Sequence, residues 1–174
     1  SIGERTFSGC TSLETLIIGN GVGNIGRSAF NGCVGLKSAT LGNALTSIGD
    51  SAFNNCTSLT SIAIPDNVTN ISRYAFYNCK RMTTLTVGTK VNTIGEGAFA
   101  NCISLTEVVL PSSVKKLTDP DWDEDGAFEG CTKLTKVTIG DNSEQQTLTS
   151  IGERTFSGCT SLETLIIGNG VGNI

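Results

Sequence analysis

The chain has 174 residues, with 12 Lys and Arg against 16 Asp and Glu. The resulting net charge of −4 provides no basic field for a phosphate backbone, so we expect no nucleic-acid partner. The longest apolar runs are three or four residues, far short of the ~20 that a helix needs to span a bilayer, so we expect no membrane span in this chain.

The first 25 residues (1–25) recur without change at 150–174, and one frame, I-G-x-x-x-F-x-x-C-x-x-L-x-x-L-x-I, repeats between them. Phenylalanines mark its register at spacings of 23, 23, 23, 23, 29 and 28 residues: Phe7, Phe30, Phe53, Phe76, Phe99, Phe128 and Phe156. A period of this length with L-x-x-L-x-L spacing is the signature of a leucine-rich repeat. We therefore predict one solenoid of about seven coils over 1–174, in which 1–149 form one block and 150–174 begin an identical next block.

Each coil is predicted to hold two short extended segments. Leu16 and Ile18 are two residues apart, so their side chains share one face of a strand, and stacking on the next coil ~4.8 Å away pairs such strands in a parallel sheet. A second extended segment is expected at 22–25, and the glycine after it, Gly26, suits a backbone turn. The same glycine recurs as Gly49 and Gly95. The Ala-Phe-x-x-Cys stretch, as at 29–33, is expected to form a helical or 3₁₀ turn on the convex side.

The residues that flank the inward strand positions should line the concave sheet face. They are rich in Thr and Ser, carry little charge and include no aromatic cluster: Thr15, Ile17, Ser38, Thr40, Ser61, Ala63, Thr84, Thr86, Glu107, Val109, Lys136 and Thr138. Two interpretations stay open for this ladder. It reflects the β-propensity of an exposed strand, or it is a platform for a ligand.

A cysteine follows three residues after every marker phenylalanine: Cys10, Cys33, Cys56, Cys79, Cys102, Cys131 and Cys159. These spacings do not match the C-x₂₋₄-C clusters of zinc sites, and the chain has no histidine. Neighbouring coils would bring the cysteines within disulfide range, so bridging stays open. The fixed inward position favours a ladder of free, buried thiols.

The stretch between Leu117 and Phe128 is enlarged and acidic. Its D-x-D-x-D-G string resembles the start of a calcium loop, with Asp121, Asp123, Asp125 and Glu129 as candidate ligands. Thr132 stands where an EF-hand needs a bidentate glutamate, so the incomplete match favours a solvated acidic loop over calcium. Apart from calcium at this loop, we predict no cofactor. This bulged repeat, with Trp122 and Asp119, is also the expected place for a specific binding contact, although Trp122 more simply caps the widened coil.

Two weaker features complete the surface. A polar insertion at 141–146 follows the strand of the same repeat and is interpreted as a loop. Three tripeptides fit the N-x-[ST] glycosylation pattern, at Asn55, Asn67 and Asn70. The sequence does not decide whether they are glycosylated.

The repeats that read Ile48-Gly49-Asp50-Ser51-Ala52-Phe53-Asn54-Asn55-Cys56 and Leu59-Thr60-Ser61-Ile62-Ala63-Ile64-Pro65 resemble the BspA-like class of leucine-rich repeats. The resemblance covers essentially the whole chain. It implies an α/β repeat solenoid, a right-handed β/α superhelix, on an extracellular or cell-surface protein of adhesion or host contact. It carries no catalytic residue.

An enzyme is the least supported class, because the chain has no histidine, no G-x-S-x-G and no P-loop, and its cysteines are repeated frame positions. The main hypothesis is a structural solenoid, a segment of a longer extracellular array that forms a rod. Its partners would be further copies, either stacked end to end or continued covalently. The alternative is an adhesin module that binds a host or matrix protein through the solenoid face.

Overall fold

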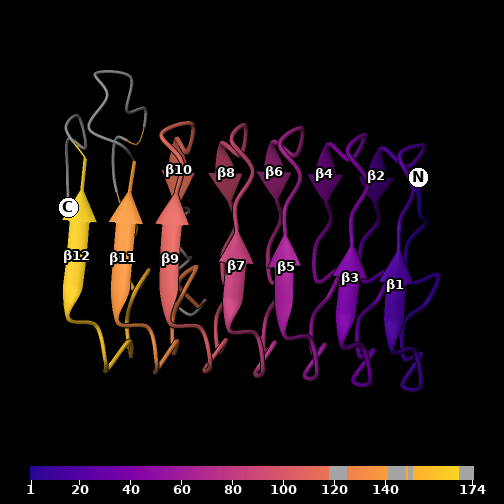
Figure 1. The fold of residues 1–174 in the computed structure, drawn as a ribbon, viewed down its shortest axis with the longest axis horizontal. Coiled ribbons are helices and arrows are strands. Elements are labelled where there is room, and N and C mark those ends of the chain that lie inside the picture. The colour runs from indigo at the N-terminus through magenta and orange to yellow at the C-terminus, as the bar shows by residue number, and fades with distance from the viewer. Residues whose placement is uncertain (118–124, 141–147, 149–150, 169–174) are drawn as a thin grey trace.

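The structure is a computed structural model that describes residues 1–117, 125–140, 148 and 151–168. The chain forms a solenoid, with its first and last coils at opposite ends (Figure 1). We number the coils 1 to 7 by the phenylalanines Phe7, Phe30, Phe53, Phe76, Phe99, Phe128 and Phe156. The leucine-rich-repeat solenoid expected from the sequence is confirmed.

One strand of each coil contributes to the long face of the solenoid. These strands are β1 (Thr15–Ile17), β3 (Ser38–Thr40), β5 (Ser61–Ala63), β7 (Thr84–Thr86), β9 (Glu107–Leu110), β11 (Lys136–Ile139) and β12 (Thr164–Ile167). They stand side by side in coil order (Figure 1), and every recorded pair is parallel. Equivalent residues of successive coils lie opposite each other, as Leu16 and Ala39 do.

A second row of two-residue strands runs along another side. It comprises β2 (Asn24–Ile25), β4 (Ser47–Ile48), β6 (Asn70–Ile71), β8 (Thr93–Ile94) and β10 (Lys116–Leu117). These five strands form one continuous parallel sheet in the order β10-β8-β6-β4-β2. The second extended segment is therefore confirmed in coils 1 to 5.

The expected helical turn is wrong: the described residues contain no α-helix and no 3₁₀-helix, and so none that could cross a membrane. The Ala-Phe-x-x-Cys stretch instead alternates two kinds of hydrogen bond. In coil 2 the amides of Ala29 and Asn31 donate three residues back, to Gly26 and Ser28, while the amide of Phe30 donates to the next coil. A helix would direct every amide along its own axis, whereas here every second amide ties one coil to the next.

Left-handed backbone accompanies this alternation. The residue two after each marker phenylalanine has positive φ in all seven coils, and it is always Gly or Asn: Gly9, Gly32, Asn55, Asn78, Asn101, Gly130 and Gly158. These two residue types tolerate that region best. Each such amide from Gly9 to Gly130 donates to the following coil, as Gly32 does to the carbonyl of Asn54 at 2.8 Å.

The core consists of ladders that run from coil to coil. The marker phenylalanines stack with ring centroids 5.1–5.7 Å apart and rings within 12° of parallel. Phe30, Phe53, Phe76, Phe99 and Phe128 are fully buried. Phe7, in coil 1, is 42% exposed. A coil therefore buries its core only when it has neighbours on both sides.

The glycines after the second strands act differently from our prediction. Gly26, Gly49 and Gly95 do not have positive φ. A Cβ added to them would lie 2.7–2.9 Å from the backbone of the preceding coil. Glycine is needed here because two coils approach closely, not because the chain turns left-handed.

Candidate functional site

The sheet face is an exposed surface with a uniform chemistry. The first and third residues of β1, β3, β5 and β7 are exposed, as the sequence predicts. Hydroxyl and small side chains dominate it, and its large exposed apolar residues are Ile17 (76% exposed), Val109 (53%) and Ile166 (44%). Its ion pair joins Lys136 to Glu107 across neighbouring strands at 2.8 Å.

The sheet is divided into three sections. Hydrogen bonds join β1 to β3, β5 to β7, and β9 to β11 and β12, but they do not join β3 to β5 or β7 to β9. We call the junctions between hydrogen-bonded strands closed and the other two open. At two of the closed junctions, the amides of Ile18 and Ile64 donate to Thr40 and Thr86 of the next coil. Among the described residues, the equivalent amides of Leu41 and Val87 have no such acceptor.

A residue one or two positions past the end of each strand explains this division. At the four closed junctions the later coil carries glycine there: Gly42, Gly88, Gly140 and Gly168. At the two open junctions the later coil carries Pro65 or Pro111.

Two properties of proline prevent the strands of neighbouring coils from forming hydrogen bonds. A Cβ at Gly42 or Gly88 would lie 2.5 or 2.3 Å from a carbonyl oxygen of the earlier coil. The amides of Gly140 and Gly168 donate to the earlier coil at 2.8 Å, and proline has no amide hydrogen. The two prolines were visible in the sequence, but our sequence analysis did not connect them to sheet pairing.

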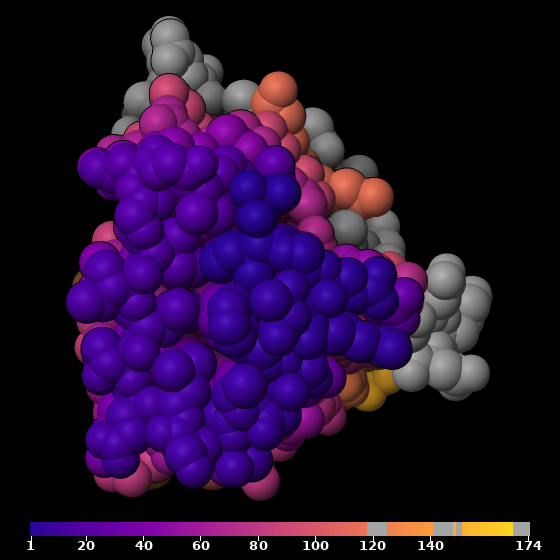
Figure 2. Space-filling view, turned by 90° about the vertical axis from the view of Figure 1, so that its right-hand side faces the viewer, coloured from indigo at the N-terminus to yellow at the C-terminus, as the bar shows by residue number. Residues whose placement is uncertain are grey.

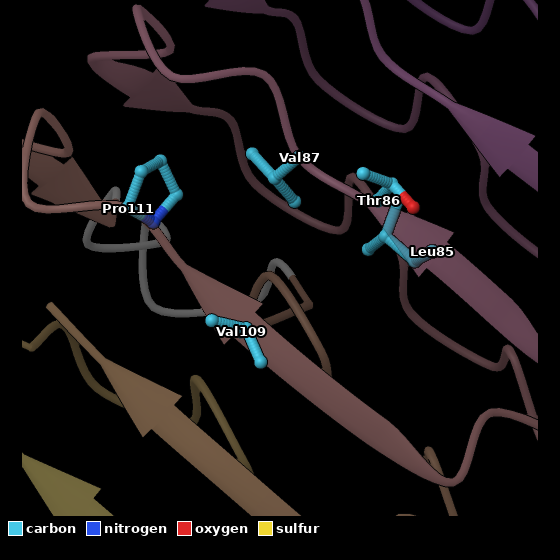
Figure 3. A pocket seen from close by; sticks show the side chains of 5 residues that line it. All are labelled: Leu85, Thr86, Val87, Val109 and Pro111. Carbon is cyan, nitrogen blue, oxygen red and sulfur yellow. The ribbon is translucent and has the colours of Figure 1, made fainter. Parts of the chain in front are cut away.

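A shallow groove follows the open junction between β7 and β9 (Figure 3). One part has a volume of about 310 Å³ and is lined by Leu85, Thr86, Val87, Val109 and Pro111. A second part, of about 220 Å³, continues along the same two strands past Thr84 and Glu107. The groove combines hydroxyls and apolar side chains with one carboxylate. It therefore suits contacts with a macromolecular surface better than catalysis.

The cysteines are free thiols, as expected, and five of them are buried. Each thiol from Cys33 onward donates to the carbonyl of the marker phenylalanine of the preceding coil, at 3.2–3.4 Å. Burial raises the pKa of Cys79 to about 12 and also raises the pKa of Cys56, Cys102 and Cys131. These thiols stay protonated and unreactive at neutral pH. They are structural groups.

Four residues of the proposed binding and calcium sites, Asp119, Asp121, Trp122 and Asp123, lie outside the described residues. Glu129 is described, and both of its carboxylate oxygens have partners: Oε1 accepts from Arg154 and Oε2 accepts from the amide of Gly126 at 2.9 Å. Within the described parts of the chain no group of three or more Cys, Asp or Glu could hold a metal. The calcium site stays a prediction.

The three glycosylation candidates all have engaged amide groups. The side chain of Asn55 accepts from Asn78, that of Asn67 donates to the carbonyl of Asn43, and that of Asn70 donates to the hydroxyl of Ser72. A glycan attaches to Nδ2, which is the donating atom in the contacts of Asn67 and Asn70 but takes no part in the recorded contact of Asn55.

Comparison with known proteins places this geometry in a family. A family model described as a BspA-type leucine-rich repeat region, present in six copies, matches residues 1–120 and 124–174. The chain belongs to the BspA-type leucine-rich repeat family. No curated protein matches it.

Solved structures of leucine-rich repeat proteins share the solenoid fold. A leucine-rich repeat protein of T. pallidum is 29% identical with a TM-score of 0.78, over 87% of this chain and 68% of that one. One from Bacteroides ovatus is 27% identical with a TM-score of 0.62, over 99% and 60%. A leucine-rich cell surface protein of Faecalibacterium prausnitzii, 20% identical with a TM-score of 0.50 over 95% and 62%, shares the fold. The chain thus spans about two thirds of the length of these proteins.

Proposed function

We propose that this chain is a non-enzymatic structural solenoid, one stretch of a longer extracellular array in which the 149-residue block recurs and forms a rod. The observation that carries this proposal is the repeated coil. Coils 1 and 7 have the same sequence but opposite surroundings, since coil 1 packs on coil 2 and coil 7 packs on coil 6.

The two copies nevertheless adopt the same backbone. Arg5 and Arg154 have φ of 53° and 57°, and Gly9 and Gly158 have φ of 73° and 71°. The intracoil hydrogen bond from the Cys10 amide to Phe7 (3.3 Å) recurs from Cys159 to Phe156 (3.2 Å). Over the described residues of the two copies, 2–19 and 151–168, the repeated sequence therefore accepts a neighbour on either side and keeps these backbone features, as an internal coil of a continuous array must.

The extracellular location rests on the family and on the cell-surface protein of F. prausnitzii among its structural relatives. The absence of enzymatic activity rests on the surface chemistry of the described residues. Five of the seven cysteines are buried thiols, burial raises the pKa of Cys79 among them to about 12, and the groove holds one carboxylate, Glu107.

Small-angle X-ray scattering of a two-block chain, residues 1–149 followed by 1–174, tests this proposal. If the repeated coil joins blocks, the longest dimension grows by about 30 Å, six coils at ~4.8 Å each, while the cross-section stays constant. The single chain is the matched control. A widened cross-section, or two particles joined by a flexible connection, would refute the continuous rod.

The alternative function is an adhesin module, and the groove between β7 and β9 is the observation that favours it. Its threonine hydroxyls, its apolar side chains and the exposed Val109 suit a host or matrix protein. Binding to immobilised matrix proteins should weaken at least tenfold in Val109→Lys and stay unchanged in Val34→Lys, which alters an exposed valine outside the groove. Equal binding by both variants would exclude the groove as the contact site.

A further inference from the structure

Asparagine precedes glycine at three places in the sequence, at Asn20, Asn31 and Asn169. This dipeptide is chemically labile, because the glycine amide nitrogen can attack the asparagine side chain and glycine has no Cβ to hinder the attack. Asn169 lies outside the described residues. Asn20 and Asn31 are both described, and they differ in how the structure holds the glycine amide.

The glycine after Asn31 is fixed in the turn stretch of coil 2. Its amide, on Gly32, donates to the carbonyl of Asn54 in coil 3 at 2.8 Å, and Gly32 has a φ of 72°. Asn31 and Gly32 are both partly buried. An attack by this nitrogen therefore requires that the two coils first separate locally.

The glycine after Asn20 lies in an exposed turn of coil 1, the coil onto which Figure 2 looks. The amide of Val22 closes this turn by donating to the carbonyl of Gly19 at 3.3 Å. Within the described parts of the chain, the Gly21 amide has no recorded acceptor. A Cβ added to Gly21 would meet nothing within 4 Å. The Gly21 nitrogen is therefore accessible.

This accessibility belongs to the turn position and not to coil 1. The equivalent pairs of coils 2, 3 and 4, each of which lies between two other coils, are exposed as well: Asn43 and Ala44, Asp66 and Asn67, Thr89 and Lys90. The backbone amides of Ala44, Asn67 and Lys90 also lack an acceptor among the described residues. A further coil packed before coil 1 would therefore leave the Gly21 amide accessible.

The side chain of Asn20 is held by the next coil. The amide of Asn43 donates to its Oδ1 at 2.7 Å. This oxygen gains negative charge when a nucleophile attacks Cγ, so a donor placed on it stabilises that charge. The contact leaves Nδ2, the group that must depart, facing away from this donor.

We propose that Asn20 is a site of spontaneous deamidation in the folded chain. The Gly21 nitrogen gives its proton to a base in the solvent and forms a bond to Cγ of Asn20. The bond between Cγ and Nδ2 breaks, and Nδ2 takes up a proton and leaves as ammonia, so that a succinimide ring remains. Water then opens the ring at one of its two carbonyls and produces aspartate or isoaspartate. The sum consumes one water and releases one ammonia, without an oxidant or reductant.

The fold accepts an aspartate at this position. Asp66 is the equivalent residue of coil 3, and its Oδ1 accepts from the amide of Thr89 at 2.8 Å, as Oδ1 of Asn20 does from Asn43. Hydrogen bonds from the Thr89 amide and hydroxyl lower the pKa of Asp66. An aspartate at position 20 is therefore expected to be ionised at neutral pH. The modification adds one negative charge to the exposed turn and keeps the contact between coils.

Mass spectrometry of the full chain, incubated under reducing conditions at mildly alkaline pH and then cut with trypsin, tests the proposal. Cleavage after arginine and lysine places the two sites in separate peptides, 6–27 and 28–37. Fragment ions distinguish Asn20 from Asn24 in the first peptide. We expect Asn20 to convert several-fold faster than Asn31, because a hydrogen bond must break before Gly32 can react.

Two controls show whether the fold causes this difference. In urea, which unfolds the chain, the rates at Asn20 and Asn31 should converge. In Gly21→Ala the new methyl group meets no neighbour but shields the nitrogen, so conversion of Asn20 should slow several-fold while Asn31 stays unchanged. Circular dichroism checks that the variant is folded.

Three results would overturn the proposal. The first is conversion of Asn31 as fast as that of Asn20 in the folded chain. The second is a ratio of the two rates that urea leaves unchanged, since the difference would then come from neighbouring residues in the sequence. The third is an unchanged rate at Asn20 in Gly21→Ala.

Discussion

Glycines at the coil junctions show how single atoms set the coil spacing. A Cβ at Gly49 would lie 2.8 Å from the carbonyl oxygen of Ile25 and 2.9 Å from two further backbone atoms. Backbone atoms cannot move aside as a flexible side chain does, so a methyl group here must push two coils apart. Gly21, in contrast, has nothing within 4 Å of an added Cβ.

We predict that Gly49→Ala lowers the free energy of unfolding by about 2–3 kcal/mol, the upper range for overpacking. Gly21→Ala should change it by less than about 1 kcal/mol, with a stabilising sign if its backbone is compatible. Urea denaturation of both variants measures the difference. Equal effects would mean that the close approach at Gly49 is not a constraint.

The buried thiols make the fold sensitive to alkali. Burial raises the pKa of Cys79 to about 12, whereas a thiol in the unfolded chain has a pKa of about 8.5. The fold favours the neutral thiol, so this stabilisation is fully present below about pH 8.5 and is lost as pH rises towards 12. Each such thiol removes about 1.4 kcal/mol per pH unit in that window.

Thermal unfolding should therefore give a Tm that is flat between about pH 6 and 8 and falls steeply above about pH 9. Cys79→Ala removes one of these thiols and should make the fall shallower. If the variant showed the same pH slope as wild type, the thiol ladder would not be the cause.

At the scale of the strand, a Gly or Pro one or two residues past the strand end decides whether the strands of neighbouring coils form hydrogen bonds. Gly88 lets coil 4 close on coil 3, and Pro111 keeps coil 5 from closing on coil 4. The β7–β9 groove is the result, so this hollow in the sheet face depends on the single residue Pro111.

We predict that Pro111→Gly closes this junction and removes the groove. The amide of Val87 should then donate to the carbonyl of Val109, as Ile64 does to Thr86 at 2.9 Å. A scalar coupling across that hydrogen bond in the NMR spectrum would detect it. Pro65→Gly is the matched control, because it should affect Leu41 and leave Val87 unchanged; an unpaired Val87 in Pro111→Gly would contradict the explanation.

The strands and the core ladders were predictable because their signal is side-chain periodicity. Leu16 and Ile18 mark a strand, and the regular Phe and Cys positions mark inward ladders. The helical turn was predicted wrongly because the side chains of Ala29 and Phe30 are compatible with a helix. Their amides donate alternately within the coil and to the next coil, and this alternation does not change the pattern of polar and apolar residues in the sequence. The groove was missed because it depends on Pro111 and Gly88, which are 23 residues apart and become neighbours only after the coils stack.

Over the whole molecule, position along the solenoid determines how much a ladder residue contributes. Phe76 is fully buried between two stacked rings, while Phe7 is 42% exposed and stacks on one ring. We predict that Phe76→Ala lowers the free energy of unfolding by about 3–5 kcal/mol and Phe7→Ala by less than half as much. Guanidinium denaturation of this 174-residue chain compares them, and equal losses would mean that stacking on a second ring does not add to the stability.

The central structural claim is that one turn-side ladder joins all seven coils while the sheet opens at the two proline junctions. Amide hydrogen exchange followed by NMR tests it most directly at four equivalent positions. The amides of Ile18 and Ile64, which donate to the next coil at 2.8 and 2.9 Å, should exchange slowly, and those of Leu41 and Val87 should exchange at least about tenfold faster. Similar protection at all four positions would contradict the division of the sheet.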